Sequence, residues 1–423
     1  MVIELINTGS ELMLGRVLNT HQQWLCRQLA DLGLVVSRQV AVADSGRDIE
    51  AAVREALARA DLVVTTGGLG PTSDDITRDL IAQMLGKKLK EDGSAMAHIQ
   101  QFFDVRKRTM PERTRVQALV PEGAIVLPNP HGTAPGLAME VSPNPFRQAK
   151  PSWLIMLPGP PRELRPMFTT SVVPLLERCW PAYERYVCRT LRTTGIGESM
   201  VQEKIGNTLE PLVAGGLDLG YCARPGQVDV RIAARGAAAE RIVSDAEAIV
   251  RQHLEKHIFG LEDEELEEVV IRMLTSRKET LAVAESCTGG CISNRLTNVS
   301  GASAVLLAGL VTYSNAAKQK FLGVAAETLA QHGAVSEPVG REMAEGARRE
   351  ADSDYALSVT GIAGPSGGTP EKPVGTVFIG LAGPFKTIVV KNLNPYDRET
   401  FKQVTAQQAL DLLRRKLLKA ERD

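Results

Sequence analysis

The sequence has no long uninterrupted hydrophobic run and almost no net charge. None of its apolar stretches reaches about 18–20 residues, the length that spans a bilayer as a helix, so we expect no transmembrane helix and no membrane partner. Lys and Arg number 49 against 50 Asp and Glu, a formal net charge of −1. Because no positive field covers the chain as a whole, the composition disfavours direct nucleic-acid binding.

Cysteines and targeting signals are also sparse. The six cysteines, at positions 26, 179, 188, 222, 287 and 291, show no metal-ligand spacing, which is typical of reduced thiols in a cytoplasmic protein. The first residues, MVIELINTGSELML, lack a basic segment and contain an early glutamate, so we do not expect a signal peptide. With 423 residues, 43% hydrophobic and 23% charged, the chain is expected to form two or three globular domains.

Strands alternate with helices in the first half of the chain. The apolar runs VIELINT, LVVSRQVAV and DLVVTT read as strands, with helical patterns between them. Asn19 and Gln22 are spaced as a capping box at the start of the first helix, Ser45 can begin the second, and Gly33 stands where a helix C-terminal glycine belongs. This alternation predicts right-handed βαβ units and a parallel sheet.

A glycine-rich loop, TTGGLGPTSDDITRD at residues 65–79, follows the third strand. Its glycines allow close approach of the backbone to an anion: Gly67, Gly68 and Gly70. The spacing matches neither a P-loop nor G-x-G-x-x-G, so spacing alone is weak evidence for nucleotide binding. Asp74 and Asp75 would repel a phosphate unless a divalent cation bridges them. Alternatively, both only complement the dipole of the next helix, which Ser73 can cap.

Residues from about 176 to 258 differ in character. YERYVCRTLRTTGIGES reads as a strand and turn, MVQEKIGNTL as a helix, LGYCARPGQVDVRIAARG as a hairpin and AAAERIVSDAEAIVRQHLEKHI as a second helix. Such a βαββα module is similar to a KH-type fold, but GIGE ends in an acid where the KH clamp needs flanking basic residues. We therefore favour a spacer or dimerisation module over an RNA-binding one. The acidic GLEDEELEEVV that follows reads as a solvated linker entering a helix.

A serine stands between a strand and a helix in AESCTGGCISNRL, residues 284–296. ETLAVA before it reads as a buried strand, so the turn should expose Ser286 and point backbone N–H groups into the same space. Tyr313 and Lys318 follow the next strand, AVLLAGLVTYS. Because open α/β sheets build their sites at the carboxyl ends of the strands, we expect these three side chains to lie on one edge.

This trio suits covalent catalysis if the lysine is neutral. A serine hydroxyl is a weak nucleophile until a base removes its proton, and this half of the chain offers no suitable histidine. A lysine can be that base if burial lowers its pKa from about 10.4 toward neutrality, and a tyrosine between the two can relay the proton. Taken singly, each residue is more often an ordinary turn, strand-end or surface-helix residue.

Cys287 is the rival nucleophile, because a thiol is intrinsically more reactive than a hydroxyl. It would need a lowered pKa, and adjacent residues of a strand point to opposite sides, so only one of Ser286 and Cys287 should face the pocket. Two other motifs fail on spacing. SCTG lacks the lysine of an S-x-x-K site, and Tyr313 and Lys318 are too far apart for a Y-x-x-x-K pair.

A third loop, TGIAGPSGGTPEKPVGTV, is long and rich in glycine and proline. Loops of this length without structure of their own are usually functional. Thr360, Gly361 and Gly364 can present amides to a phosphate or an oxyanion, and Lys372 can add charge. Its other glycines could simply make it flexible.

These motifs resemble those of the CinA family. TTGGLGPTSDDITRD, with NTGSELMLGRVLNT before it and LPGPPREL after it, is similar to the family's molybdopterin-binding-like N-terminal domain, which is described as a metal-dependent ADP-ribose pyrophosphatase. The resemblance implies metal ligands at Asp74 and Asp75. Arg162 and Glu163 are further candidate site residues beside Pro160, where the family usually has a smaller aliphatic residue. The implied phosphate and crevice residues are Gly67, Gly68, Gly70, Glu11 and Asn19.

In the second half, AESCTGG, VTYSNAAK, TGIAGP and KPVGTV stand in the order of the family's C-terminal domain, a nicotinamide mononucleotide deamidase. The resemblance implies that Ser286 is the nucleophile and that Tyr313 and Lys318 activate it. Thr360 would be a partner for the substrate or the tetrahedral intermediate. The implied substrate contacts are Thr288, Gly289, Gly290, Asn315, Gly361, Gly364 and Lys372.

We therefore expect an α/β protein of three domains. These are a molybdopterin-binding-like parallel-sheet domain at 1–175, a small KH-like α+β module at 176–258 and an α/β CinA domain at 262–423. The expected reactions are hydrolysis of nicotinamide mononucleotide to nicotinate mononucleotide and ammonia, and of ADP-ribose to AMP and ribose 5-phosphate.

The expected cofactors and partners follow from the same resemblance. We expect a divalent metal ion for the N-terminal domain, no cofactor for the deamidase, these nucleotides as partners and a homodimer in the cytoplasm. Two alternatives stay open: a binding protein associated with competence or DNA damage, and a pterin-binding protein of molybdenum cofactor synthesis.

Overall fold

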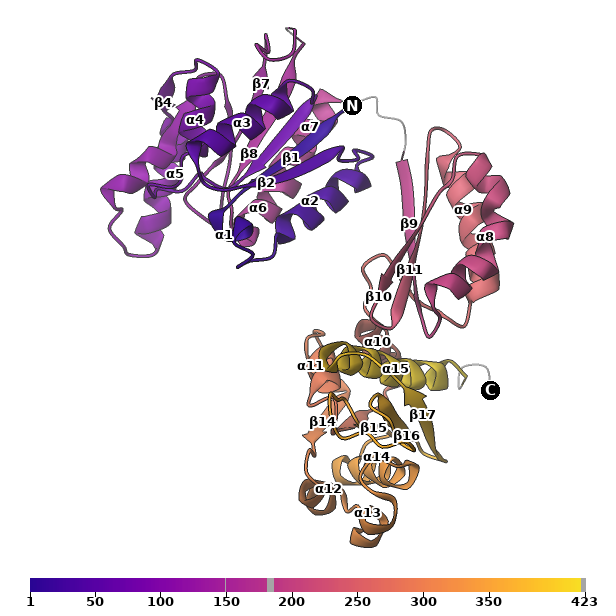
Figure 1. Cartoon of the computed structure of the whole chain (residues 1–423). Coiled ribbons are helices and arrows are strands. Elements are labelled where there is room, and N and C mark those ends of the chain that lie inside the picture. The colour runs from indigo at the N-terminus through magenta and orange to yellow at the C-terminus, as the bar shows by residue number, and fades with distance from the viewer. Residues whose placement is uncertain (149, 181–185, 420–423) are drawn as a thin grey trace. The chain divides into compact units, whose positions relative to one another are not determined.

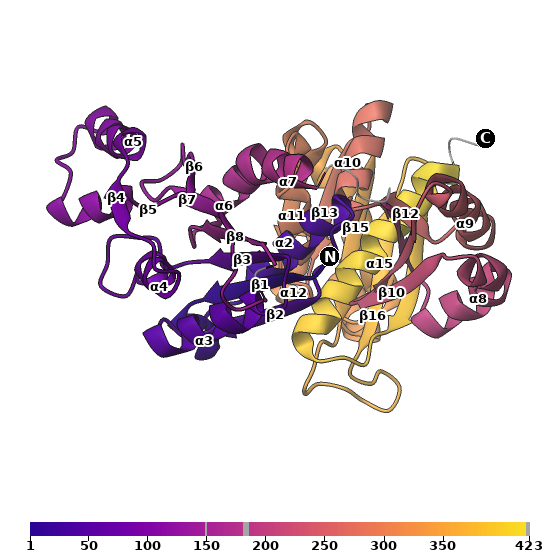
Figure 2. The ribbon, with the colours of Figure 1, turned by 90° about the horizontal axis from the view of Figure 1, so that it is seen from above.

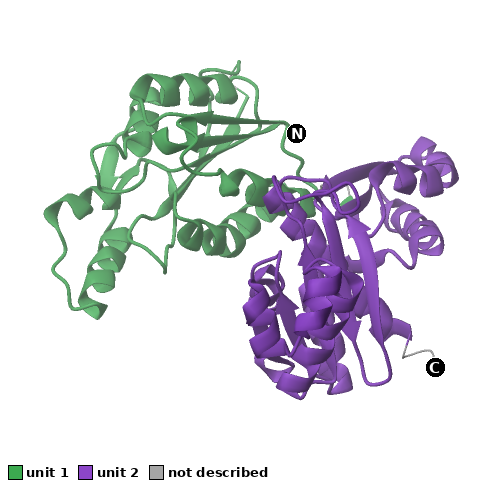
Figure 3. Ribbon diagram, turned by 60° about the horizontal axis from the view of Figure 1, so that its bottom comes forward, with its two compact units in different colours: residues 1–186 green, residues 187–423 purple. Residues whose placement is uncertain are grey.

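The computed structural model forms two compact units, residues 1–186 and 187–423 (Figure 3). The structure describes all residues except 149, 181–185 and 420–423, and these gaps fall one in each of the three expected domains. The strand expected from Tyr183 therefore begins outside the described residues. Within them, no helix is both long enough and apolar enough to cross a membrane.

A six-stranded sheet forms the centre of the first unit, in the order β2-β1-β3-β8-β7-β6 (Figure 1). Its strands are β1 (Ile3–Thr8), β2 (Arg38–Val42), β3 (Leu62–Thr66), β6 (Ile125–Leu127), β7 (Gly136–Val141) and β8 (Ser152–Leu157). The first four in sheet order run parallel, as the alternation of strands and helices predicted. β7 and β6 pair antiparallel at one edge, so the sheet is mixed and not purely parallel.

Helices cover both faces of this sheet. They are α1 (Ser10–Met13), α2 (Thr20–Asp31), α3 (Gly46–Leu57), α4 (Thr77–Met84), α6 (Pro161–Met167), the π-helix η2 (Phe168–Val172) and α7 (Val173–Cys179). Successive side chains of a strand point to opposite faces. On β3, Leu62 and Val64 therefore join the core under α2, α6 and α7, whereas Val63 joins the core under α3 and α4.

A smaller lobe is inserted between α4 and β6. It contains β4 (Leu89–Glu91), α5 (Gly93–Val105), the 3-10 helix η1 (Glu112–Ala118) and β5 (Leu119–Pro121). β4 and β5 pair antiparallel, and Ile99 and Ala118 anchor a small apolar core beneath them.

Three predicted helix boundaries are confirmed and one is wrong. The Asn19 side chain accepts a hydrogen bond from the backbone N–H of Gln22, Ser45 caps α3, and Gly33 has φ 78° after α2. Ser73 does not cap the next helix, because α4 begins only at Thr77.

The middle module has the predicted strand–helix–hairpin–helix order, followed by one more strand. Its elements are β9 (Tyr186–Thr194), α8 (Glu198–Ala214), β10 (Asp218–Arg224), β11 (Gln227–Arg235), α9 (Ala239–Leu254) and β12 (Ile258–Leu261). The strands form one sheet in the order β10-β11-β9-β12, and both helices lie on the same face of it (Figure 1).

The C-terminal sheet has the order β14-β13-β15-β16-β17. Its strands are β13 (Leu281–Glu285), β14 (Leu306–Val311), β15 (Tyr355–Gly361), β16 (Thr376–Ala382) and β17 (Thr387–Leu393). β14, β13 and β15 run parallel. β16 pairs antiparallel with β15, and β17 pairs antiparallel with β16. The carboxyl ends of the three parallel strands therefore meet at one edge.

Two helical layers enclose this sheet. The helical elements are α10 (Leu266–Arg277), α11 (Cys291–Thr297), η3 (Ala302–Ala304), α12 (Asn315–Leu322), α13 (Ala326–His332), α14 (Glu337–Ala351) and α15 (Arg398–Lys419). α10, α11 and α15 pack on one face, and α12, α13 and α14 on the other (Figure 1). Figure 2 shows the long α15 running along its face of the sheet.

The acidic stretch before α10 is only partly the solvated linker that its charge predicted. Residues 261–263 are exposed, but those from 264 to 267 are half-buried or buried. Glu265 and Glu268 form a capping box at the start of α10, and Glu267 pairs with Arg295 at 2.6 Å. The charge pattern alone does not predict the ion pair of Glu267 with Arg295.

Candidate functional site

The Ser286 side chain lies at the carboxyl end of β13, where it meets a buried lysine. Lys318, in the first turn of α12, places Nζ 2.9 Å from Ser286 Oγ. The same nitrogen lies 2.9 Å from the carbonyl oxygen of Thr312 and 3.3 Å from that of Tyr313. Lys318 is 1% exposed and Ser286 9%. The structure thus brings together the two groups that a serine amidase with a lysine base requires.

A neutral amine can make all three contacts. A carbonyl oxygen can only accept, so Thr312 and Tyr313 can take the two hydrogens of an uncharged Lys318. The remaining lone pair is then free to accept from the Ser286 hydroxyl. Burial lowers the pKa of Lys318 below the ordinary value for lysine, because desolvation disfavours the ammonium form.

The structure does not place the Tyr313 hydroxyl between the lysine and the serine. The Tyr313 side chain is 61% exposed, and Arg398 donates to its hydroxyl at 2.8 Å. The predicted proton relay is therefore absent from this geometry, since Lys318 reaches Ser286 directly. Tyr313 contributes its backbone carbonyl to the lysine instead.

Thr360 stands level with Ser286 on the neighbouring strand. β13 and β15 pair in parallel with Glu285 opposite Val359, so Ser286 and Thr360 come next in register. The Thr360 hydroxyl donates to the carbonyl of Ala334 at 2.7 Å. Its hydrogen is therefore engaged with the loop between α13 and α14, and only its lone pairs remain for another group.

Cys287 belongs to the apolar core on one face of the sheet, whereas Lys318 comes from α12 on the other face. It is buried among residues of α10, α11 and α15, and this burial raises the pKa of its thiol to about 12. A thiol is a nucleophile as its thiolate, so Cys287 is unreactive near neutral pH. Ser286 thus contacts the lysine, whereas Cys287 belongs to the apolar core.

In the first unit, a cleft of about 410 Å³ lies at the carboxyl ends of β1, β3 and β8. The glycine-rich loop lines it with Gly67, Gly68 and Gly70. An added Cβ on Gly70 would stand 2.3 Å from an Asp75 carboxylate oxygen, so only glycine lets that carboxylate fold over the loop. Five carboxylate residues line the cleft: Glu11, Asp44, Asp74, Asp75 and Glu163.

The chemistry of this lining suits a cation together with an anionic ligand. No lysine or arginine among the described residues lines the cleft, so a pyrophosphate would meet five carboxylates and no positive side chain. Within the described chain, no three His, Cys, Asp or Glu side chains form a complete metal cage. Mg²⁺ is usually held by one or two carboxylates plus phosphate oxygens and water, and the cleft supplies such donors.

Asp75 has one carboxylate oxygen already committed. That oxygen accepts from the backbone N–H of Thr72 at 2.9 Å and from the Thr72 hydroxyl. The other oxygen makes no hydrogen bond among the described residues. Asp75 therefore both shapes the loop and offers a donor to the cleft.

Three family models match consecutive parts of the chain. "Probable molybdopterin binding domain" matches residues 4–178, "Damage-inducible protein CinA KH domain" 188–260 and "CinA C-terminal domain" 263–417. A CinA-like protein from Kosmotoga olearia is 43% identical over 99% of this chain and 99% of its own length. The chain belongs to the CinA family.

Other similar proteins cover the whole chain or about a third of it. A protein from Caldicellulosiruptor bescii, whose name refers to competence-damage inducible proteins, is 43% identical over 99% of this chain and all of its own. The solved competence damage-inducible protein A from Klebsiella pneumoniae is 38% identical, with TM-score 0.36, over 36% of this chain and 95% of that one. The competence/damage inducible protein from Agrobacterium tumefaciens is 40% identical, with TM-score 0.33, over 35% and 91%.

One residue that sequence reasoning missed in this CinA-family chain is Glu285, beside the serine. Its carboxylate is fully buried and accepts from the backbone N–H groups of Gly290, Ile292 and Ser293 at 2.8–3.1 Å, and from the Ser293 hydroxyl at 2.7 Å. It thereby satisfies the first amides of α11, which a helix leaves without partners. Glu285 fixes the turn that carries Ser286.

We expect Glu285→Gln to loosen this turn. An amide side chain has one acceptor oxygen and turns its NH₂ group toward backbone N–H donors, so the variant should lower the stability of the C-terminal domain by about 2 kcal/mol. Thermal and urea unfolding measure this. The matched control is Glu345→Gln, at an exposed position on α14, which should unfold like the parent. Equal stability of the two variants would contradict the capping role of Glu285.

The remaining predicted contacts of the deamidase site are spread over three segments. Gly289 and Gly290, with φ 60° and 95°, form the turn after Ser286, and Thr288 is buried between them and the serine. Asn315 is exposed at the start of α12. In the third loop, Lys372 donates to the carbonyl of His332 at 2.8 Å, so its side chain binds the C-terminal end of α13.

Arg398, which sequence reasoning also missed, holds the third loop. It begins α15 and donates both to the carbonyl of Gly364 at 3.1 Å and to the Tyr313 hydroxyl. Gly361, at the end of β15, has no room for a side chain, because an added Cβ would stand 2.8 Å from the carbonyl oxygen of Thr376. Arg398 thus links the loop to the segment that precedes Lys318.

Two candidates of the N-terminal site do not line the cleft. Asn19 caps α2, and its side-chain nitrogen also donates to Gln22 at 3.1 Å. The Arg162 side chain is 81% exposed, and only a long contact of 3.8 Å joins it to Glu163. Glu163 does line the cleft, where Asn129 donates to it at 2.8 Å.

Proposed function

We propose that the C-terminal domain is a serine-type amidase that hydrolyses the carboxamide of nicotinamide mononucleotide. The observation that carries the proposal is the 2.9 Å contact between Lys318 Nζ and Ser286 Oγ, with the other two polar contacts of that nitrogen made to carbonyl oxygens. The resemblance of its four motifs to the family's deamidase domain supports the substrate.

In this reaction Lys318 takes the proton of the Ser286 hydroxyl while Oγ bonds to the carboxamide carbon. Backbone N–H groups close to Ser286 that do not donate to Glu285 stabilise the oxyanion. Lys318 then gives its proton to the leaving nitrogen, the C–N bond breaks and ammonia departs. Water, deprotonated by Lys318, hydrolyses the resulting ester, which releases nicotinate mononucleotide and restores Ser286.

We further propose that the N-terminal domain cleaves a nucleoside diphosphate sugar such as ADP-ribose with a divalent cation. Asp74 and Asp75 would hold the cation, which would neutralise the pyrophosphate, while the amides of the glycine-rich loop bind its oxygens. The acidic lining of the cleft supports this assignment, because an anion needs a bridging cation there.

One pair of assays on the full chain tests both proposals. The first measures ammonia released from nicotinamide mononucleotide, and the second measures AMP released from ADP-ribose with Mg²⁺, Mn²⁺ or EDTA. We expect deamidation in every condition and AMP only with metal. A chain that releases no ammonia contradicts the amidase, and AMP release that persists in EDTA contradicts the metal requirement.

Asp75→Ala should lower the rate of ADP-ribose cleavage at least about 100-fold. It removes a carboxylate ligand of the cation and the Thr72 contacts that shape the loop. Deamidation should stay at the parental rate and serves as the internal control. Asp79→Asn is the matched variant: Asp79 lies in α4 outside the cleft lining and pairs with Arg78. Parental cleavage by Asp75→Ala at saturating metal would remove Asp75 from the site.

A further inference from the structure

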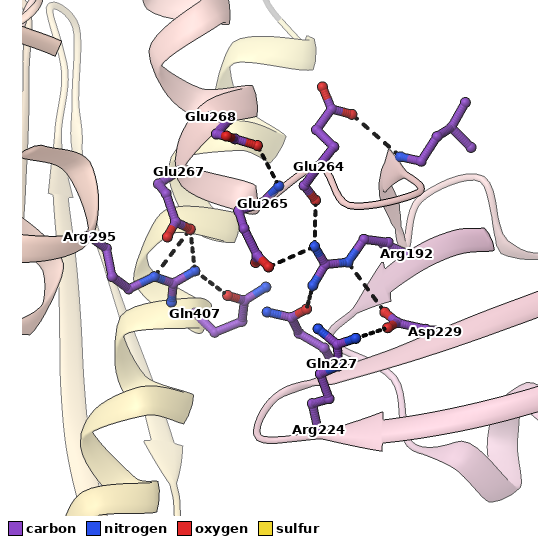
Figure 4. Close-up of polar contacts among 11 residues, drawn as sticks. Arg192, Arg224, Gln227, Asp229, Glu264, Glu265, Glu267, Glu268, Arg295 and Gln407 are labelled. Carbon is purple, nitrogen blue, oxygen red and sulfur yellow. Dashed lines mark hydrogen bonds and ion pairs between the residues drawn. The ribbon is translucent and has the colours of Figure 1, made fainter. Parts of the chain in front are cut away.

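A buried arginine joins the middle module to the C-terminal domain. Arg192, on β9, is 1% exposed and is among the largest fully buried side chains of the described residues. Within its own module it donates to Gln227 at 2.9 Å and pairs with Asp229 at 3.4 Å. Across the junction it donates to the carbonyl of Glu264 at 2.8 Å and pairs with Glu265 at 2.9 Å (Figure 4).

The hairpin turn between β10 and β11 rests on α15. Gly226, at the tip of this turn, has φ 75°, and a Cβ built on it would stand 3.2 Å from the Cβ of Gln407. Asp229, on the same hairpin, also pairs with Arg224 at 3.0 Å. Arg192 therefore fixes a hairpin that touches the long helix of the C-terminal domain.

Gln407 also contacts a second helix, α11. Arg295, on α11, donates to Gln407 at 2.8 Å and pairs with Glu267 of α10 at 2.6 Å (Figure 4). The side chains of α10, α11 and α15 thus meet directly beside the hairpin. Each of these three helices also packs in the same apolar core against β13 and β15.

Two of these helices begin in the candidate site. α11 starts just after the Ser286 turn, and Glu285 binds its first amides. α15 starts at Arg398, which holds the third loop and the Tyr313 hydroxyl. A shift of α11 or α15 at the junction would therefore move groups on both sides of Ser286. A displacement of about 1 Å at a reacting centre can lower a rate about 100-fold.

We propose that Arg192 and Gln407 are positioning residues for the amidase, so that the middle module holds the deamidase site in its working geometry. This inference rests on the proposed amidase function. It assigns the module a role in the reaction without assigning it a ligand. Neither residue touches the reacting atoms; both act through α11 and α15.

The test compares four variants of the full chain. Arg192→Met removes the fork that joins the two domains, and Arg192→Lys keeps the charge but not the fork. Because Arg192→Met removes one of the two cationic partners of the buried Asp229, it can destabilise the fold. Gln407→Met is therefore the second, milder variant. The Gln407 amide nitrogen is buried without a partner in the described structure, so this substitution removes an unsatisfied donor. It also removes the oxygen that accepts from Arg295, but Arg295 keeps its ion pair with Glu267.

The fourth variant is the control. Asp218→Asn breaks an exposed pair with Arg231 on the same hairpin, at the end of β10 away from the turn. It should leave every readout at the parental value. For all four, kcat and KM for ammonia release are measured well below the unfolding temperature, together with hydrogen–deuterium exchange of residues 286–296.

We expect kcat to fall roughly 10- to 100-fold in Arg192→Met and several-fold in Gln407→Met, with Arg192→Lys between Arg192→Met and the parent. Exchange over 286–296 should become faster in the same order. Parental kcat and exchange in both folded methionine variants would overturn the inference. If the parent itself releases no ammonia, the amidase proposal has failed, and the exchange data alone then decide whether the module orders the turn.

Discussion

Ser286→Ala should lose ammonia release from nicotinamide mononucleotide by three or more powers of ten. The variant removes the oxygen that bonds to the carboxamide carbon, and residues of a covalent catalytic unit fail almost completely when one is removed. Among the described residues, the Ser286 hydroxyl makes its side-chain contact with Lys318, so its loss leaves the packing of β13 and α12 in place. Rapid-quench and steady-state ammonia assays measure the loss, and thermal unfolding should match the parent.

Cys287→Ala is the matched comparison at the adjacent position. It removes a buried thiol from the core of α10, α11 and α15, so it should cost stability while deamidation continues at a similar rate. Thiol reagents should leave the parent active, because burial raises the pKa of Cys287 to about 12. An enzyme silenced by alkylation, with Ser286→Ala still active, would reverse the two roles.

The sequence predicted most of the fold because the spacing of apolar residues and the residues that begin and end helices are local signals. Asn19, Ser45 and Gly33 mark helix ends through their own side chains or backbone, and the structure confirms all three. Strand direction is not such a signal: a buried parallel strand and a buried antiparallel one read as the same apolar run. The antiparallel edge formed by β6 and β7 was therefore missed.

The residues of the candidate site likewise divide into those that local signals predict and those that depend on distant contacts. Ser286 and Lys318 each follow a strand of one parallel sheet, so topology alone brings them to one edge. The direction of the Tyr313 side chain depends on Arg398, which lies 85 positions further along the chain, and no local pattern reports that contact. Glu285 was overlooked because an acid beside a turn looks like a surface residue until the amides that it binds are in view.

Lys318→Ala should be nearly as inactive as Ser286→Ala, because without a base the serine hydroxyl keeps its proton. In the parent, burial lowers the pKa of Lys318, and only the uncharged amine can accept the proton. The rate should therefore rise with pH through that lowered pKa and fall about tenfold per pH unit on its acid side. Measuring kcat/KM for ammonia release from acid to alkaline pH locates this limb.

Two further measurements separate the base from a merely structural lysine. Lys318→Arg keeps a cation at the position but stays protonated at every working pH, so it should remain inactive across the whole profile. In Lys318→Ala, a small primary amine such as propylamine can enter the space left by the buried side chain and should restore part of the rate, more strongly as pH rises toward the pKa of that amine. Substantial activity in Lys318→Arg, or a parental profile with no acid limb, would show that Ser286 loses its proton to another group.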